Sequence, residues 1–225
     1  ATLNGIVNND PITLSGTPAY NFTTKAVGTN AINITGLSVT GTNASSYSLT
    51  LPSLTGTITT KSVTVTGATA QDKTYNGTTA AVVSGGTVVG AITNDAVSVS
   101  TTGTFASANA GTGIGVTIAL TGNDATNYSL TQPNITANIN KANPTFGTVA
   151  ISLGVGSTYS LTASSISNSD GTLSYGITNT AIATVSGTTI NGIAVGSTIL
   201  NVNQAASTNY NAGNTSYTCL LYTSD

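Results

Sequence analysis

The sequence repeats itself with a period near 80 residues, and this repeat limits what the chain can fold into. The matching segments, in chain order, are Gly5–Leu14 with Gly90–Val99 (offset 85), Gly28-Thr29 with Gly111-Thr112 (offset 83), Gly41–Thr50 with Gly122–Thr131 (offset 81), Pro52 with Pro133, and Lys61 with Lys141. Landmarks that keep their order, while the offset drifts at glycine-rich points, indicate two copies of one folding unit with loops of different length.

The repeat predicts three modules. Residues 62–141 form a complete repeat, and residues 1–61 form a repeat that is truncated at its N-terminal side. Residues 142–225 lack the landmarks and are predicted to be a different module. The joints at 60–62 and 140–144 are short and contain no Gly/Ser run, which favours stiff coupling.

Alternation of apolar with small or polar residues predicts an all-β chain. It is strict in Ile114–Leu120, the period-2 pattern of a strand with one buried face. Similar runs are Ser62–Thr66, Ala96–Ser100, Asn134–Asn140 and Thr198–Val202. Short strands separated by turn signals favour an elongated tandem array of small β-sandwich (Ig-like) modules. A β-solenoid is the rival fold, but it would show a period of twenty-odd residues.

Composition excludes several functions. With 4 Lys, 6 Asp and a net charge of −2, no basic face can neutralise a run of phosphates, so no nucleic-acid partner is expected. The chain has no His and no Glu, so we expect no enzyme and no catalytic, cofactor or metal site. The apolar runs are too short to insert into a membrane. Cys219 is the single cysteine and is expected to be inert.

Three groups of polar residues have two interpretations each. The pairs Asn9-Asp10, Asn94-Asp95 and Asn123-Asp124 are predicted to cap their own turns, with calcium binding as the alternative. Lys73, with the boundary lysines Lys61 and Lys141, is predicted to be solvated rather than joined to Asn in an isopeptide crosslink. Tyr47 and Tyr128, each sharing a strand face with a Leu, are predicted to enter the core rather than stack on sugars.

The segment Asp72-Lys73-Thr74-Tyr75-Asn76-Gly77-Thr78-Thr79-Ala80 resembles the signature of the bacterial YDG repeat family, with Asn76 where that family has Asp. The repeat landmarks resemble the same family, over essentially all of 1–141. Both Asn-Gly and Asp-Gly satisfy a tight turn with positive φ, so the departure leaves the turn intact. Residues 142–217 look like a bacterial Ig-like module, on segments such as Thr180–Gly187 and Ala206–Ala212.

The resemblance implies a large surface-exposed or secreted bacterial adhesin, in which such modules form the stalk. We therefore expect a structural spacer at the bacterial cell surface whose partners are neighbouring modules of the same polypeptide. The alternative is a module that itself binds a host or environmental glycan or protein, through a loop such as Ser164–Ser174. No binding residue can be assigned from the sequence.

The C-terminal residues 219–225 depart from the rest of the chain in composition. They resemble the translation of a widely used sequencing adapter, which predicts an assembly artefact. A genuine final strand is the alternative.

Overall fold

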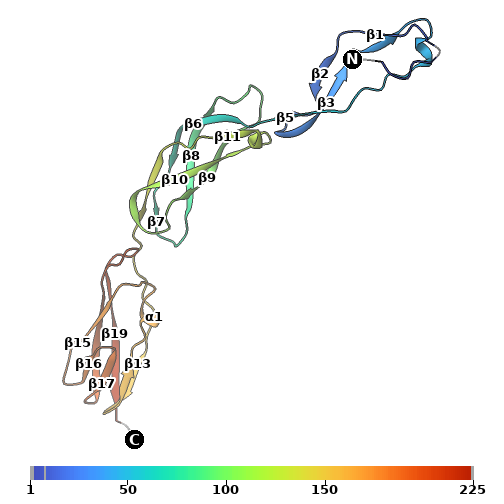
Figure 1. The fold of residues 1–225 in the computed structure, drawn as a ribbon. Helices are drawn as coiled ribbons and strands as arrows, with labels where there is room; N and C mark the ends of the chain where they lie inside the picture. The colour runs from blue at the N-terminus through green and yellow to red at the C-terminus, as the bar shows by residue number, and fades with distance from the viewer. Residues whose placement is uncertain (1–2, 8, 224–225) are drawn as a thin grey trace. The chain divides into compact units, whose positions relative to one another are not determined.

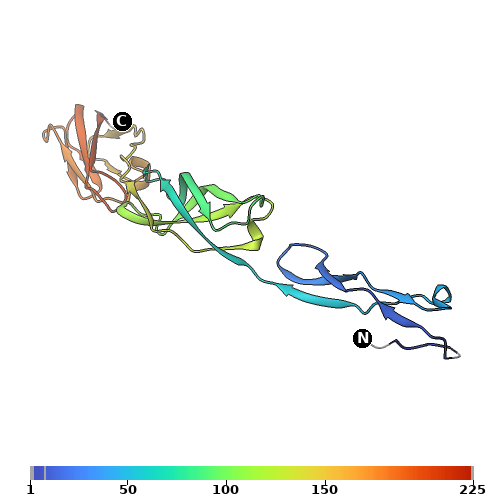
Figure 2. The same ribbon diagram turned by 90° about the horizontal axis from the view of Figure 1, so that it is seen from above.

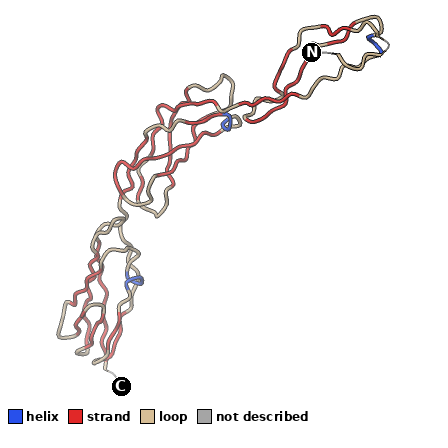
Figure 3. Tube along the Cα trace, in the orientation of Figure 1, coloured by secondary structure: helices blue, strands red, loops and turns tan. Residues whose placement is uncertain are grey.

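The computed structural model describes residues 3–7 and 9–223 of the chain. Strands dominate its regular structure, with one short α-helix and two 3-10 turns (Figures 1 and 3). The predicted all-β class is therefore confirmed. Among the described residues, no helix combines the length and apolar character needed to cross a membrane.

The chain divides into two compact units. The first comprises Ala1–Gly67, Gly86–Ser100 and Ala119–Pro133, and the second comprises Ala68–Gly85, Thr101–Ile118 and Asn134–Asp225. The second repeat contributes residues to both units.

The first repeat carries two small antiparallel sheets. Its elements are β1 (Thr13–Ser15), β2 (Ala19–Phe22), β3 (Gly28–Thr35), β4 (Ser38–Thr40), the 3-10 turn η1 (Ala44–Ser46) and β5 (Leu54–Ile58). One sheet pairs β1 with β4, and the other has the order β2-β3-β5. Ile12 is the one hydrophobic residue that is buried in the described part of 1–61, so this repeat has little core of its own.

The second repeat forms a larger sheet. Its elements are β6 (Lys61–Ala70), β7 (Lys73–Thr74), β8 (Ala80–Val89), β9 (Ser98–Phe105), β10 (Gly111–Thr121), η2 (Ala125–Asn127), β11 (Tyr128–Leu130) and β12 (Ile135–Asn140). The strand order is β11-β6-β8-β9-β10-β12-β7. Two residues separate β5 from β6, which Figure 2 shows following it in cyan.

The alternation seen in the sequence corresponds to alternating burial in the second repeat. Val63 and Val65 on β6 are buried, as are Val116 and Ile118 on β10, while the residues between them are exposed. The predicted strand at Ala96–Ser100 begins instead at Ser98, because Ala96 and Val97 lie in the loop that precedes β9, where the N–H of Ala96 bonds to Asp124.

The C-terminal residues build two sheets around one core. The elements are β13 (Ile151–Gly154), β14 (Thr158–Ser160), α1 (Ala163–Ile166), β15 (Leu173–Ile177), β16 (Ala183–Ser186), β17 (Thr189–Gly192), β18 (Gly196–Gln204) and β19 (Gly213–Tyr222). One sheet has the order β13-β19-β18-β15 and the other β14-β17-β16. Ile190 of the second sheet and Leu200 and Val202 of the first lie in the same buried cluster.

The atypical C-terminal segment is part of this core as far as Tyr222. Cys219 and Leu221 are buried, whereas Leu220 is 54% exposed and points the other way along β19. The segment packs as a final strand does. Residues 224–225 lie outside the described residues.

The loop proposed for ligand binding is anchored in the same core. Ile166 is buried, and the Oγ atom of Ser167, also buried, donates a hydrogen bond to Oε1 of Gln204. The sheets of the chain are curled half-barrels. The finer expectations, a tandem array of Ig-like sandwiches and the module boundaries, stay predictions.

The repeat landmarks adopt the same backbone conformation in both copies. Asn9 and Asn94 have positive φ angles of 52° and 72°, and the next residue in each copy closes the turn onto Val7 or Ile92. Asn tolerates this left-handed conformation better than most residues. The copies identified from the sequence are therefore copies in structure.

Candidate functional site

The separated landmarks of each repeat meet at one tyrosine. In the second repeat the Tyr128 hydroxyl donates to Oδ2 of Asp95 at 2.6 Å and accepts from the backbone N–H of Ile92 at 2.9 Å. In the first repeat the Tyr47 hydroxyl likewise donates to Oδ2 of Asp10 and accepts from the N–H of Val7, at 2.9 and 3.0 Å. The Asn-Asp pair and the Tyr-Ser-Leu tripeptide (Tyr47–Leu49 or Tyr128–Leu130) thus form one hydrogen-bonded cluster per repeat.

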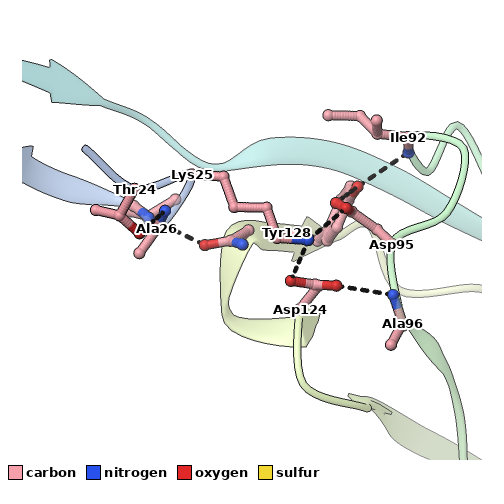
Figure 4. Close-up of polar contacts among 10 residues, drawn as sticks. Thr24, Lys25, Ala26, Ile92, Asp95, Ala96, Asp124 and Tyr128 are labelled. Carbon is pink, nitrogen blue, oxygen red and sulfur yellow. Dashed lines mark hydrogen bonds and ion pairs between the residues drawn. The ribbon is translucent and has the colours of Figure 1, made fainter. Parts of the chain in front are cut away.

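A lysine of the first repeat enters the cluster of the second (Figure 4). The Lys25 ammonium lies 2.8 Å from Oδ1 of Asp95 and 2.7 Å from Oδ1 of Asp124. The Lys25 side chain is 63% exposed, whereas those of Asp95 and Asp124 are 10% and 13% exposed. We call these three residues the Lys25 clamp; all of them belong to the first compact unit.

The Lys25 clamp shifts the titration of each member. Hydrogen bonds from Lys25 and then from Tyr128 hold the pKa of Asp95 below its usual range. Lys25 and the backbone N–H of Ala96 lower the pKa of Asp124. The two carboxylates, Asp124 first, raise the pKa of Lys25. All three groups therefore remain charged around neutral pH.

A backbone contact accompanies the ion pairs. The N–H of Val27 donates to Oδ1 of Asn127 at 3.0 Å. The loop that carries Lys25 and Val27 is shaped by Asn30, whose side-chain amide donates to the carbonyl oxygens of Ala26 and Gly28. We call this set of contacts between the two repeats the first joint.

Residues of the second repeat and the C-terminal module meet through a similar pair of groups, all in the second compact unit. Ala110, the counterpart of Val27 at the offset of 83, donates its N–H to Oδ1 of Asn209 at 2.9 Å. Asn209 precedes Tyr210 as Asn127 precedes Tyr128. In each repeat, therefore, an N–H of the same loop donates to the asparagine of an Asn-Tyr pair in the module that follows.

We call the contacts between the second repeat and the C-terminal module the second joint. It has no counterpart of Lys25 and is held by other contacts. Ala108 stands at the position that corresponds to Lys25, and Lys141 instead donates to the carbonyl oxygen of Ser207 at 2.7 Å. The rings of Tyr75 and Tyr210 meet edge to face, with centroids 5.5 Å apart. Such an aromatic pair stabilises beyond its buried area.

The segment Asp72–Ala80 shapes the end of the second repeat at the second joint. The Lys73 ammonium donates to Oδ1 of Asn76 at 3.0 Å and to the carbonyl oxygens of Thr78 and Ala80 at 2.6 and 3.0 Å. Asp72 accepts from the backbone and side-chain amides of Asn138, which lowers its pKa. The segment has the hydrogen bonds of a folded loop, and it places Tyr75 against Tyr210.

A profile of the YDG domain matches residues 1–56 and 59–137. The chain belongs to the YDG domain family. No curated protein matches the sequence. The two matched stretches correspond to the two copies of the repeat, so the Lys25 clamp joins one YDG repeat to the next.

Two predictions about these residues were wrong. The YDG signature lysine, Lys73, is not merely solvated, because it closes the loop around it. Asp95 and Asp124 do not cap their own turns: Asp95 accepts from Lys25 and Tyr128, and Asp124 accepts from Lys25 and the backbone N–H of Ala96. Asn9 and Asn94 adopt a turn geometry with positive φ, and Gly77 has the predicted positive φ, at 75°.

The tyrosine prediction was right for the complete repeat. Tyr128 is 7% exposed, whereas Tyr47 is half-buried. Among the residues that the structure describes, no group of three or more His, Cys, Asp or Glu side chains could hold a metal ion.

Sequence reasoning missed Lys25. Its partners are 70 and 99 positions away in sequence, and its counterpart in the second repeat is Ala108. One signal was available: in a chain with four lysines, Lys25 lies three residues before the Gly28-Thr29 landmark, in a loop without strand alternation.

Replacing Lys25 by Met is expected to raise the pKa values of Asp95 and Asp124. Because their folded pKa values are depressed, the clamp stabilises fully above the unfolded carboxyl pKa of about 4 and is lost as pH falls through the folded values. At high pH the raised pKa of Lys25 sets the limit. Its stabilisation is full below the unfolded lysine pKa of about 10.4 and is lost as pH rises through the folded value. Carboxyl carbon NMR titrations of both proteins measure these shifts. Lys141→Met is the matched control, and equal pKa values in wild type and Lys25→Met would contradict the clamp.

Replacing Asn209 by Ala is expected to loosen the second joint. The change removes the acceptor for Ala110 and the donor to Asn109, at a cost of about 1–2 kcal/mol. Trypsin cleavage after Lys141 is expected to become several-fold faster, since it requires the joint to open. Thr208→Ala, at the position directly before Asn209, should leave the rate of trypsin cleavage unchanged. A wild-type rate for Asn209→Ala would show that this contact does not hold the joint.

Proposed function

We propose that the chain is a structural spacer of a bacterial cell-surface adhesin, which presents a binding region away from the cell. The supporting observation is the recurrence of one contact at both joints, where a loop N–H of a YDG repeat donates to the side-chain oxygen of an asparagine in the next module. A repeated joint defines how each successive module is attached, and this is what a spacer requires. The adhesin context rests on the family resemblance described above.

The proposal assigns no chemical reaction and no cofactor to these modules. The acidic residues that converge, Asp95 and Asp124, are both bound by Lys25 and lie in a joint. Carboxylates held in this way serve as ion-pair partners rather than as general acids or bases, which need a pKa near the working pH. The extracellular location and the neighbouring modules as partners belong to the same proposal.

Small-angle X-ray scattering on the intact chain tests the spacer role. Three modules in line, each roughly 35–40 Å long, would give a radius of gyration of about 30 Å. A compact globule of this length would give about 17 Å. The large value is expected, and Lys25→Met combined with Asn209→Ala should broaden the distance distribution. A value near 17 Å would contradict the spacer and favour the alternative of direct ligand binding.

A further inference from the structure

The chain contains three Asn-Gly pairs, Asn4-Gly5, Asn76-Gly77 and Asn191-Gly192. Asparagine is a chemically labile residue, and a following glycine increases this lability because it has no side chain to shield its backbone nitrogen. Attack of that nitrogen on the asparagine side chain requires a free glycine N–H and is favoured by donors around the asparagine oxygen. The structure separates the three pairs by these two features.

The pair Asn191-Gly192 is protected by its strand. Asn191 lies on β17, where it is paired with Thr158 of β14 and with Thr184 of β16. The N–H of Gly192 donates to the carbonyl oxygen of Ser157 at 3.0 Å, and Gly192 is buried. A nitrogen held in this way cannot turn toward the side chain of the preceding residue.

The pair Asn76-Gly77 is open at the glycine nitrogen. Both residues are exposed, and the N–H of Gly77 makes no hydrogen bond within the described part of the chain. A Cβ atom added to Gly77 would meet only the hydroxyl oxygen of Tyr75, at 4.0 Å, besides its chain neighbours. Water and the Asn76 side chain therefore have access to this nitrogen.

The side-chain oxygen of Asn76 accepts three hydrogen bonds. Its donors are Nζ of Lys73 at 3.0 Å, the N–H of Thr78 at 3.2 Å and Oγ1 of Thr78 at 2.9 Å. Attack on an amide carbon places negative charge on this oxygen, so donors already aimed at it stabilise the transition state, and a cationic donor does so most strongly. Asn4 is exposed as well, but no described residue donates to its Oδ1 atom.

We propose that Asn76 is a site of self-modification, at which the backbone nitrogen of Gly77 attacks Cγ of Asn76 and the side-chain amide is lost as ammonia. As the new N–Cγ bond forms, the C=O electron pair moves onto Oδ1, where Lys73 and Thr78 stabilise it. The electron pair then returns, the bond from Cγ to Nδ2 breaks, and Nδ2 leaves as ammonia with the proton from Gly77. Water opens the resulting five-membered imide, at Cγ to give aspartate or at the main-chain carbon to give isoaspartate.

The two products differ in their effect on the second joint. Aspartate at position 76 keeps the main chain and places a carboxylate beside the Lys73 ammonium, so an ion pair replaces a hydrogen bond to a neutral amide. Isoaspartate adds a carbon to the main chain of the loop that places Tyr75 against Tyr210, and it is expected to loosen this contact. The modification goes beyond the spacer role and does not depend on it.

The experiment incubates the intact 225-residue chain in mildly alkaline buffer and follows it by peptide mapping with mass spectrometry. All three pairs are measured in one sample, so Asn4 controls for exposure and Asn191 for pairing in a strand. Asn76 is expected to convert to aspartate and isoaspartate about tenfold faster than Asn4, while Asn191 stays intact. A rate at Asn76 no higher than the rate at Asn4 would overturn the proposal.

Two variants test the donors. Lys73→Met removes the cation and Thr78→Val removes the hydroxyl, and each is expected to slow the reaction at Asn76 about tenfold. Thr78→Val leaves the bonds from Lys73 to the carbonyl oxygens of the loop in place, so its effect does not require the loop to open. Lys141→Met is the matched control and should react at the wild-type rate.

Two further outcomes would contradict the proposal. One is a wild-type or higher rate at Asn76 in Thr78→Val, which would show that the donors do not promote the reaction. The other is a loss of ammonia that water and hydroxylamine do not reverse, because Nζ of Lys73 would then have attacked Cγ in place of the Gly77 nitrogen.

Discussion

A chain that ends at Thr218 is expected to lose its folded C-terminal module. The truncation removes Leu221 and Cys219, which are 1% and 0% exposed. Deleting a buried leucine side chain alone costs about 2–5 kcal/mol. A module of about 80 residues is stabilised by roughly 4–12 kcal/mol, so the loss is comparable to the whole.

Backbone pairing makes the expected loss larger. All four register pairs between β13 and β19, from Ile151 opposite Cys219 to Gly154 opposite Tyr222, lie beyond Thr218. Without them β13 has no partner in its sheet. Urea unfolding followed by circular dichroism, with the chain ending at Tyr222 as reference, measures the effect.

An exposed position on the same strand provides the control. Leu220→Thr changes a residue that is 54% exposed and should alter stability by no more than about 0.5 kcal/mol. If the chain ending at Thr218 unfolds at the same urea concentration as the reference, the final residues are dispensable and the adapter interpretation gains support.

The burial of Cys219 agrees with the expectation that this cysteine is inert. Burial raises the pKa of its thiol, so little thiolate forms at neutral pH. The sequence predicted an inert cysteine from its being alone in the chain. The structure adds that the thiol fills space between the sheets.

Strands were predictable because side-chain alternation is a local property. In Ile114–Leu120 every second residue faces the interior, and burial of Val116 and Ile118 follows from the sequence pattern alone. The repeat was predictable for a similar reason, since the turn residues that set its loops recur at nearly constant offsets. Both inferences need no knowledge of which strands pair.

The Lys25 clamp could not be predicted in this way. Asp95 and Asp124 are 29 positions apart, and no local pattern in the sequence connects them. The two carboxylates come together because the segments Gly90–Val99 and Gly122–Thr131 are linked by the hydrogen bond between Tyr128 and Asp95. Lys25 reaches them because the first repeat is attached to the second. Tyr47 shows the same limit, because an identical motif is buried less deeply where the β6 pairing does not occur.

Replacing Gly122 by Ala is expected to destabilise the first compact unit by about 3 kcal/mol or more. Gly122 has a φ of 112°, a conformation that costs a side-chain-bearing residue about 1–3 kcal/mol. The added Cβ would collide with the carbonyl oxygen of Ala96 and lie 2.8 Å from its carbon. Gly41 in the first repeat meets Pro11 in the same way, which explains why this glycine recurs as a landmark.

The collision would act directly on the Lys25 clamp. Ala96 and Asp124 exchange two hydrogen bonds, from the N–H of Ala96 to Oδ2 of Asp124 at 2.8 Å and from the N–H of Asp124 to the carbonyl oxygen of Ala96 at 3.0 Å. Moving Ala96 away breaks both, so the pKa of Asp124 should rise as stability falls. Urea unfolding and the carboxyl NMR titration measure the two effects in one protein.

Gly115→Ala is the matched control, since Gly115 is exposed on β10 and an added Cβ would meet no atom within 4 Å. That change should be neutral or stabilise by up to about 1 kcal/mol, because alanine restricts the unfolded chain more than glycine does. If Gly122→Ala and Gly115→Ala unfold at the same urea concentration, the close approach of Gly122 to Ala96 does not constrain the repeat, and the recurrence of the glycine needs another cause.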